Sequence, residues 1–414
     1  MSLLRHADFR RLFAADCFSQ LGMFVGMTAI PLLAATVLAA TPFEMGLLTA
    51  AEQLGFLLIG LPAGVWVDRM RRRGLMIAAD LTRAALMLSI PIAWWLGVLT
   101  LAQVIAAVLL TGIATVFFDV SYQSYLPSLV GREHLVEGNA KLQAVQSTAI
   151  LAGPSAAGVL VQLISAASTV LLTGLGYLGS ALCLLRIRVR ESKPERAPHE
   201  RLVPQMAEGL RFVFHNTTLR AITLCTATAN LFSGVFEAVR VLFLSRTIGL
   251  SPAVIGIVFA AGGVGGILAA LCSGAIVRRV GQARSIWLVP LLTWPFMLLF
   301  PFTTGAWGLA FAFVSLICSG FGIIIYNVAQ VSYRQAICPD RLLGRMNASV
   351  RFVVWGASPI GGFVGGVLGE TMGIAGTIWV GIGGQAASML WVLFSPLLRM
   401  RDLPVAEKTG SLAT

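Results

Sequence analysis

The feature that most constrains this chain is a series of twelve long apolar runs that hold very few charged residues. A helix needs about 20 such residues to cross the roughly 30 Å hydrocarbon core of a bilayer. Strands of a membrane barrel alternate apolar and polar residues over only about ten positions, which these runs do not do. The sequence therefore predicts an all-α integral membrane protein. Its transmembrane helices are expected near residues 11–38, 43–66, 75–97, 100–120, 139–164, 166–186, 218–245, 252–277, 284–304, 307–330, 347–369 and 374–396.

The distribution of charge gives the orientation of these helices. Only 12% of the residues are charged, yet the net charge is +12, which by itself suggests a nucleic-acid partner. If the N-terminus, every second loop and the C-terminus lie in the cytoplasm, 27 of the 30 Lys and Arg residues fall on that side, as the positive-inside rule requires. The exceptions are Arg83, Arg240 and Arg246. We therefore expect a multi-pass cell-membrane protein with both termini cytoplasmic and no nucleic-acid partner.

A charged segment after the sixth run divides the helices six and six. We expect an N-terminal bundle at 1–187, a cytoplasmic linker at 188–217, a C-terminal bundle at 218–398 and a cytoplasmic tail at 399–414. Within the linker, Met206, Leu210, Val213 and Phe214 share one helical face. That pattern predicts an amphipathic helix on the inner membrane surface. The alternative, a solvated linker, fits residues 191–204.

The two halves of the chain contain an internal repeat. Residues 41–69 align without a gap with residues 251–279, at an offset of 210. A second match pairs Asn139-Ala140 with Asn347-Ala348. Such a duplication predicts two six-helix bundles related by an axis along the membrane normal, with a cavity between them near the midplane. The identical pairs in the first match are Pro42 and Pro252, Gly46 and Gly256, Ala50 and Ala260, Gly55 and Gly265, Gly64 and Gly274, and Arg69 and Arg279.

One loop resembles a family signature. The segment GVWVDRMRRR at 64–73 is similar to the loop between helices two and three of major facilitator superfamily transporters, with Arg71 in place of the usual second glycine. The stretches FFDVSYQSYLPSLV at 117–130 and AGPSAAG at 152–158 resemble the twelve-helix drug:proton antiporters of the macrolide efflux and enterobactin exporter branch. One departure is Val108, which occupies the position of an arginine that many drug antiporters carry in helix four.

The resemblance implies the major facilitator fold and proton-coupled transport by alternating access. It also implies a cytoplasmic gate formed by Gly64, Asp68, Arg69, Arg72 and Asp119. In that gate Asp119 ends helix four beside the loop arginines. Asp68 caps the positive N-terminal end of helix eleven when the inner side is shut.

Ionisable residues within the apolar runs are the candidates for proton coupling, because they are costly in a bilayer and are usually functional. Glu52 lies near the midplane of the second run, and Asp16 and Glu237 are further candidates. Each has a structural alternative. Glu237 and Arg240 stand three residues apart and can form a neutralising pair. Asp80 and Arg83 have the same spacing, and we interpret them as a structural ion pair.

Polar, methionine and aromatic residues in the runs are candidates for the wall of the substrate cavity, since such surfaces adapt to varied ligands. Helix packing is the alternative role for each, and we expect only some of them to face the cavity. The candidates are Gln20, Met23, Met27, Gln53, Asn230, Phe236, Arg240, Tyr326, Asn327 and Gln330.

The sequence gives no sign of an energy-converting or metal site. It has no G-x-x-x-x-G-K-[ST] loop for ATP, no C-x-x-C pair, and no histidine within an apolar run. We therefore expect no cofactor, no metal and no catalytic residue. The predicted function is proton-coupled efflux (antiport) of amphiphilic small molecules, such as antibiotics or natural products, by a monomer in the bilayer. The alternatives that remain are a siderophore or metabolite exporter, a nutrient importer, and a membrane-embedded enzyme or receptor.

Overall fold

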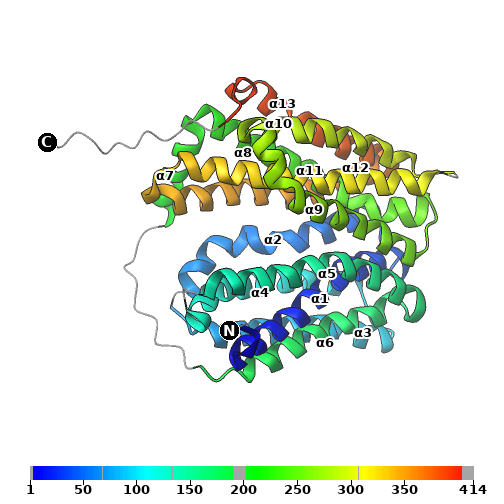
Figure 1. The fold of residues 1–414 in the computed structure, drawn as a ribbon. Helices are drawn as coiled ribbons and strands as arrows, with labels where there is room; N and C mark the ends of the chain where they lie inside the picture. The colour runs from blue at the N-terminus through cyan, green and yellow to red at the C-terminus, as the bar shows by residue number, and fades with distance from the viewer. Residues whose placement is uncertain (1–2, 68, 132–133, 190–201, 306, 403–414) are drawn as a thin grey trace.

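The computed structural model describes residues 3–67, 69–131, 134–189, 202–305 and 307–402, and these are helical almost throughout (Figure 1). The prediction of an all-α membrane fold is confirmed. The first half contains α1 (Ala7–Thr36), α2 (Pro42–Val67), α3 (Arg72–Trp95), α4 (Leu101–Val130), α5 (Leu135–Ile164) and α6 (Ala166–Leu185). The remainder contains α7 (Leu202–His215), α8 (Thr217–Leu242), α9 (Pro252–Val280), α10 (Gln282–Thr293), α11 (Gly308–Ile337), α12 (Asp340–Ser388) and α13 (Leu390–Leu393).

The predicted number of twelve spans depends on one glycine in α12. Eleven helical segments in the described residues are long and apolar enough to cross a membrane, and the last runs from Leu342 to Leu393. Gly373 interrupts it with a φ of +82°. L-residues with a side chain rarely adopt that backbone conformation. The glycine therefore divides α12 into two membrane crossings, which brings the total to twelve.

Several helices are longer than predicted at the end that carries the basic loops. The α4 helix continues to Val130 rather than 120, α11 continues to Ile337 rather than 330, and α12 begins at Asp340 rather than 347. An apolar run stops at the first polar residues, but the backbone hydrogen bonds of a helix continue beyond the bilayer core. Asp119 consequently lies eleven residues inside α4 and does not end it.

Short polar side chains and glycines set the helix ends. Thr100 Oγ1 accepts a hydrogen bond from the Gln103 amide at 3.3 Å at the start of α4. Asn216 caps α8 in the same way, since its Oδ1 accepts from the Leu219 amide at 3.0 Å. Both side chains satisfy donors that have no partner within the first turn of a helix. Gly131 ends α4 with a φ of +77°.

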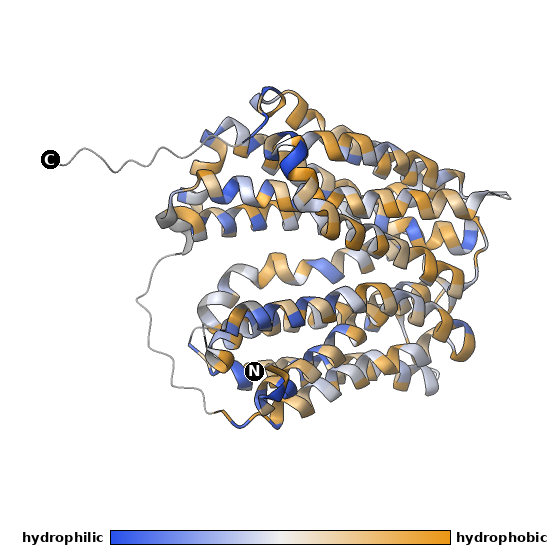
Figure 2. Ribbon diagram, in the orientation of Figure 1, coloured by the Kyte–Doolittle hydropathy of each residue, from blue (hydrophilic) through white to orange (hydrophobic). Residues whose placement is uncertain are grey.

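The helices form two bundles, which we call the N bundle (α1–α6) and the C bundle (α8–α13). The N-terminus, the end of α6 and the start of α7 mark one end of the molecule, the linker end; α1 ends and α2 begins at the opposite, far end (Figure 1). Apolar residues extend along the helices of both bundles (Figure 2), as expected of membrane spans. The ribbons of the two bundles lie close together at the far end and diverge toward the linker end (Figure 1).

The α7 helix packs on the C bundle. Arg345 Nη1 in α12 bonds to Glu208 Oε2 in α7 at 2.5 Å, and Ser349 Oγ donates to the Met206 carbonyl at 3.1 Å. Gly209 makes this approach possible, because an added Cβ would lie 2.5 Å from the Arg345 carbonyl oxygen. The linker helix is thus attached to α12. The solvated linker expected at 191–204 lies largely outside the described residues.

The internal repeat is visible in how the bundles touch. Gly46 of α2 packs on Gly366 of α12, and Gly256 of α9 packs on Gly158 of α5. Gly46 and Gly256 are equivalent in the first match of the repeat, and Gly158 and Gly366 are equivalent in the register of the second. The two crossings are therefore copies of one contact, in which glycines let helix backbones approach closely.

Hydrogen bonds also join the bundles at the far end. The Phe43 amide donates to Glu370 Oε2 at 3.4 Å, and the Ala253 amide donates to Gln162 Oε1 at 3.4 Å. Each amide is in the first turn of its helix, where it has no partner within that helix. These bonds are again copies of each other by the repeat. Together with the glycine contacts, they hold the far end closed.

Candidate transport cavity

A cavity of about 510 Å³ lies between the two bundles. Its wall includes residues of α1, α2, α3, α4 and α6 from the N bundle and of α8, α9 and α12 from the C bundle. The volume is within the range of small-molecule binding sites. Both bundles contribute, so a molecule bound there would contact both of them.

Most of the wall is apolar and adaptable. Methionine side chains are flexible and polarisable, and aromatic rings offer flat surfaces, so the wall can accommodate ligands of varied shape. The methionines are Met23, Met27, Met45 and Met87, and the aromatic residues are Phe56, Tyr177, Phe259 and Trp355.

The C bundle contributes an ion pair to this wall. Arg240 Nη2 lies 2.7 Å from Glu237 Oε2, which confirms the neutralising pair expected from their spacing. The Arg240 guanidinium also lies over the Phe259 ring, 3.9 Å from its centroid. The ring face and the carboxylate both favour the cation, so Arg240 is held firmly in α8.

Glu52 faces this pair from the N bundle. It lies on α2 ten residues after Pro42, about 15 Å along the helix at 1.5 Å per residue, and it lines the cavity. Within the described part of the chain its carboxyl forms no hydrogen bond or ion pair, but it interacts electrostatically with both Glu237 and Arg240. A carboxyl group of one bundle is thus placed against a charged pair of the other.

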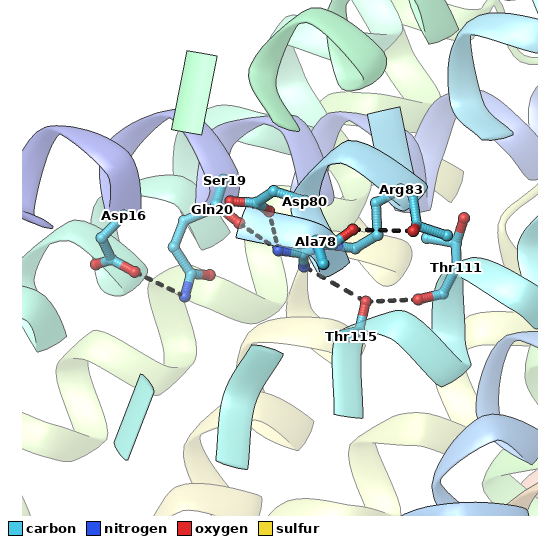
Figure 3. Close-up of polar contacts among 9 residues, drawn as sticks. Asp16, Ser19, Gln20, Ala78, Asp80, Arg83, Thr111 and Thr115 are labelled. Carbon is cyan, nitrogen blue, oxygen red and sulfur yellow. Dashed lines mark hydrogen bonds and ion pairs between the residues drawn. The ribbon is translucent and has the colours of Figure 1, made fainter. Parts of the chain in front are cut away.

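A second polar cluster is buried inside the N bundle (Figure 3). Arg83 is only 1% exposed and forms an ion pair with Asp80, as its spacing predicted. Its guanidinium lies over the Phe118 and Tyr177 rings, 4.2 and 4.4 Å from their centroids. It also donates to Thr115 Oγ1 at 3.4 Å. Tyr177 and Thr115 both line the cavity, so Arg83 lies directly behind its wall.

Asp16 and Gln20 belong to the same bundle interior rather than to this cavity (Figure 3). Gln20 Nε2 approaches Asp16 Oδ1 at 3.5 Å. Asp16 is 2% exposed, and its second oxygen has no hydrogen-bond partner among the described residues. The proton-binding role predicted for Asp16 stays a prediction.

Four of the predicted cavity residues, Met23, Met27, Gln53 and Arg240, line the cavity. The other six do not line it: three contact another helical element, two bond within their own helix, and one is exposed outside the cavity. Gln20 turns to Asp16, Asn230 donates to the Val354 carbonyl, Phe236 packs on Phe300, Tyr326 bonds to Thr226, and Gln330 donates to Asn327, which is itself exposed outside this cavity.

We did not identify one face of α4 as part of the cavity wall from the sequence. Val108, Thr111, Thr115 and Asp119 are spaced by three and four residues and all line the cavity. This is the spacing of one helical face, and polar residues at that spacing in a membrane span are a signal that the sequence contains. We did not predict this face of α4 because we expected the helix to end near residue 120, beside Asp119.

The predicted gate residues are at or near the linker end. Asp68 lies outside the described residues, and Arg69 is exposed. Arg72 Nη1 donates to the Ser124 carbonyl of α4 at 3.0 Å. Around Gly64 there is open space. Asp119 is displaced from this group, since it is inside α4 and faces the cavity. The gate stays a prediction, with Asp119 in a different place than expected.

Two six-helix bundles that are related by a sequence repeat and closed at one end over a central cavity define a membrane transporter of the major facilitator superfamily. Residues 1–410 match the family described as transmembrane secretion effector, and the chain belongs to it. The resemblance drawn from the loop motif is thereby confirmed.

The names of two relatives state what those proteins transport or how they act. The chain is 25% identical over 381 residues to the multidrug efflux pump Tap of Mycolicibacterium fortuitum, covering 88% of this chain and 90% of that protein. It is also 25% identical over 361 residues to the enterobactin exporter EntS of Escherichia coli O127:H6, covering 84% and 82%.

Solved structures share the fold. A bacterial homologue of the iron transporter ferroportin in an inward-facing state aligns with a TM-score of 0.74 at 16% identity, covering 95% of this chain and 99% of that one. An outward-facing structure of such a homologue aligns with a TM-score of 0.60 at 17% identity, covering 93% and 98%.

Proposed function

We propose that this protein is a proton-coupled exporter that moves amphiphilic small molecules out of the cytoplasm in exchange for protons. The observation that carries the proposal is the composition of the cavity wall: a methionine-rich, aromatic surface in which Glu52 of one bundle faces the Glu237–Arg240 pair of the other. The names of the relatives Tap and EntS support efflux as the direction.

The distribution of basic residues supports the orientation. Placing the linker end in the cytoplasm puts 27 of 30 Lys and Arg residues on the inner side, as the positive-inside rule favours. The far end then faces outward. Since the far end is closed, the conformation is inward-facing.

The moving parts are the bundles at 1–187 and 218–398, with the linker at 188–217 between them. Rocking of the bundles changes the surroundings of Glu52, because Glu52 belongs to α2 and its charged neighbours belong to α8. An ionised Glu52 is attracted by Arg240 and repelled by Glu237, whereas the protonated carboxyl carries no charge and lacks both of these interactions. The proton affinity of Glu52 therefore depends on the conformation, which is the linkage that coupling requires.

The test is transport in proteoliposomes driven by a pH gradient, with Glu52→Gln as the variant. We expect gradient-driven transport to be lost, because the amide cannot exchange a proton. Exchange of substrate down its own gradient should remain, since the amide resembles the protonated carboxyl.

The matched control is Glu44→Gln, which alters another acid of α2. Glu44 lies in the first turn, outside the cavity lining, where its Oε2 accepts from the Thr41 amide at 2.8 Å. This variant should transport normally. Wild-type gradient-driven transport by Glu52→Gln would remove Glu52 from the mechanism.

A further inference from the structure

We propose that Asp119 binds the positively charged group of the substrate, so that this transporter selects cationic amphiphiles. The inference rests on the proposed function, since it names the substrate class that the same cavity takes. Its basis is the position of Asp119, its lack of a partner, and the charges around it.

Asp119 is on the face of α4 that carries Thr111 and Thr115, with eleven further residues of helix beyond it. Asp119 is exposed and lines the cavity, whereas Glu52 and Glu237 are half-buried and Asp16 and Asp80 are buried. A carboxyl group placed there can reach a bound molecule.

Of the three acids that line the cavity in the described residues, Glu52 and Asp119 form no ion pair, and Asp119 is the one that does not interact with Arg240. Glu237 is paired with Arg240 at 2.7 Å, and Glu52 interacts with that same arginine. Asp119 forms no hydrogen bond or ion pair with any residue in the described ranges. The charged groups that interact with it are the buried acid Asp16 and Arg83, which is paired with Asp80 and lies over the Phe118 and Tyr177 rings.

The net charge of the cavity wall favours a cationic ligand. Among the residues that the structure describes, the lining contains the three acids Glu52, Asp119 and Glu237 and a single base, Arg240. With all four ionised the wall carries two net negative charges. A cationic ligand reduces this imbalance, whereas an anionic ligand adds to it in a space partly shielded from water, where like charges repel more strongly.

The rest of the cavity wall suits the apolar part of a cationic amphiphile. Tyr177 lies within electrostatic range of Asp119, and the cavity lining also includes methionine side chains and the rings of Phe56, Phe259 and Trp355. Rings attract cations as well as apolar groups. A carboxylate at one end of an apolar, aromatic cavity matches a molecule with one positive group and a large apolar body.

The test is direct binding to the purified full-length protein at one fixed pH and without a gradient. The probes are tetraphenylphosphonium, a permanent cation with no proton to exchange, and chloramphenicol, a neutral amphiphile. Asp119→Asn should weaken tetraphenylphosphonium binding by roughly 10- to 100-fold, as expected for loss of one charge partner at an intermediate effective dielectric constant. Chloramphenicol binding should not change.

Two further variants distinguish the loss of the Asp119 charge from a loss of the folded structure. Asp119→Glu should restore most of the tetraphenylphosphonium affinity, and Glu44→Gln, which changes an acid of α2 outside the cavity lining, should retain it. Equal tetraphenylphosphonium binding by wild type and Asp119→Asn overturns the inference and leaves the proposed function standing. If the wild type binds neither probe, both the inference and the proposed cavity are refuted. Because no gradient is present, loss of proton coupling does not affect the result.

Discussion

Replacing Gly46 by alanine should open the far end of the protein. An alanine Cβ at this position would lie 2.4 Å from Gly366 Cα and 2.7 Å from the Gly362 carbonyl oxygen. Both are backbone atoms of α12, so no side-chain rotation can relieve the contact. The bundles must separate at this crossing, and the closed far end is destabilised relative to the conformation in which the crossing is open.

The magnitude follows from the cost of overpacking. Forcing one extra methyl group into a packed contact costs about 1–3 kcal/mol, which corresponds to a change of roughly 5- to 150-fold in a two-state equilibrium. Alanine is also the better helix former by about 1 kcal/mol, but this gain is common to both conformations and cancels. Because of the repeat, Gly256→Ala should act alike, since its Cβ would lie 2.3 Å from the Pro154 carbonyl oxygen.

The assay is a distance measurement between two spin labels in a cysteine-free background. Val98 and Thr304 are suitable label positions, because both are exposed in loops at the far end, one in each bundle. We expect Gly46→Ala to increase the population with a long distance between the labels. Gly383→Ala is the control, since a Cβ there meets nothing within 4 Å, and its distance distribution should match the wild type.

An unchanged distribution in both Gly46→Ala and Gly256→Ala would refute the reasoning. It would mean that the bundles absorb the added methyl groups without separating. A shift in Gly383→Ala of the same size would be equally damaging, because it would show that helix propensity alone moves the equilibrium.

Two other expectations concern buried or bridging arginines. Arg246 Nη2 donates to the Ala35 carbonyl across the bundles at 2.7 Å, so Arg246→Met should favour the open far end by about 0.3–1 kcal/mol. The same spin labels measure this shift, and an unchanged distance distribution would show that the bond does not stabilise the closed far end. Arg83→Met should lower stability by about 3–5 kcal/mol, because it leaves the Asp80 charge buried without its partner. In thermal unfolding, the double variant with Asp80→Asn should regain part of this loss, and a double variant no more stable than the single one would contradict the explanation.

The sequence alone determined the number of spans and their pairing. A membrane helix must satisfy its backbone hydrogen bonds within itself, so each long apolar run specified one crossing without reference to its neighbours. Even the break at Gly373 falls between two predicted runs. The repeat that aligns Gly46 with Gly256 likewise corresponded to a symmetric pair of helix contacts.

Only the tertiary structure decided which polar residues face the cavity. Gln20, Asn230 and Gln330 were as plausible for the wall as Gln53, but each forms a hydrogen bond within its own bundle. Gln20 and Gln330 bond to a side chain about one turn away in their own helices, and Asn230 bonds to a carbonyl of α12. Packing decides which of these partners is available, and a polar group left without one is costly in the membrane interior. Asp119 turned from a gate residue into a cavity residue for a related reason: α4 continues past the point at which its apolar character ends. Hydropathy marks where a helix can lie in the bilayer, whereas packing sets how far it extends and which way its side chains point.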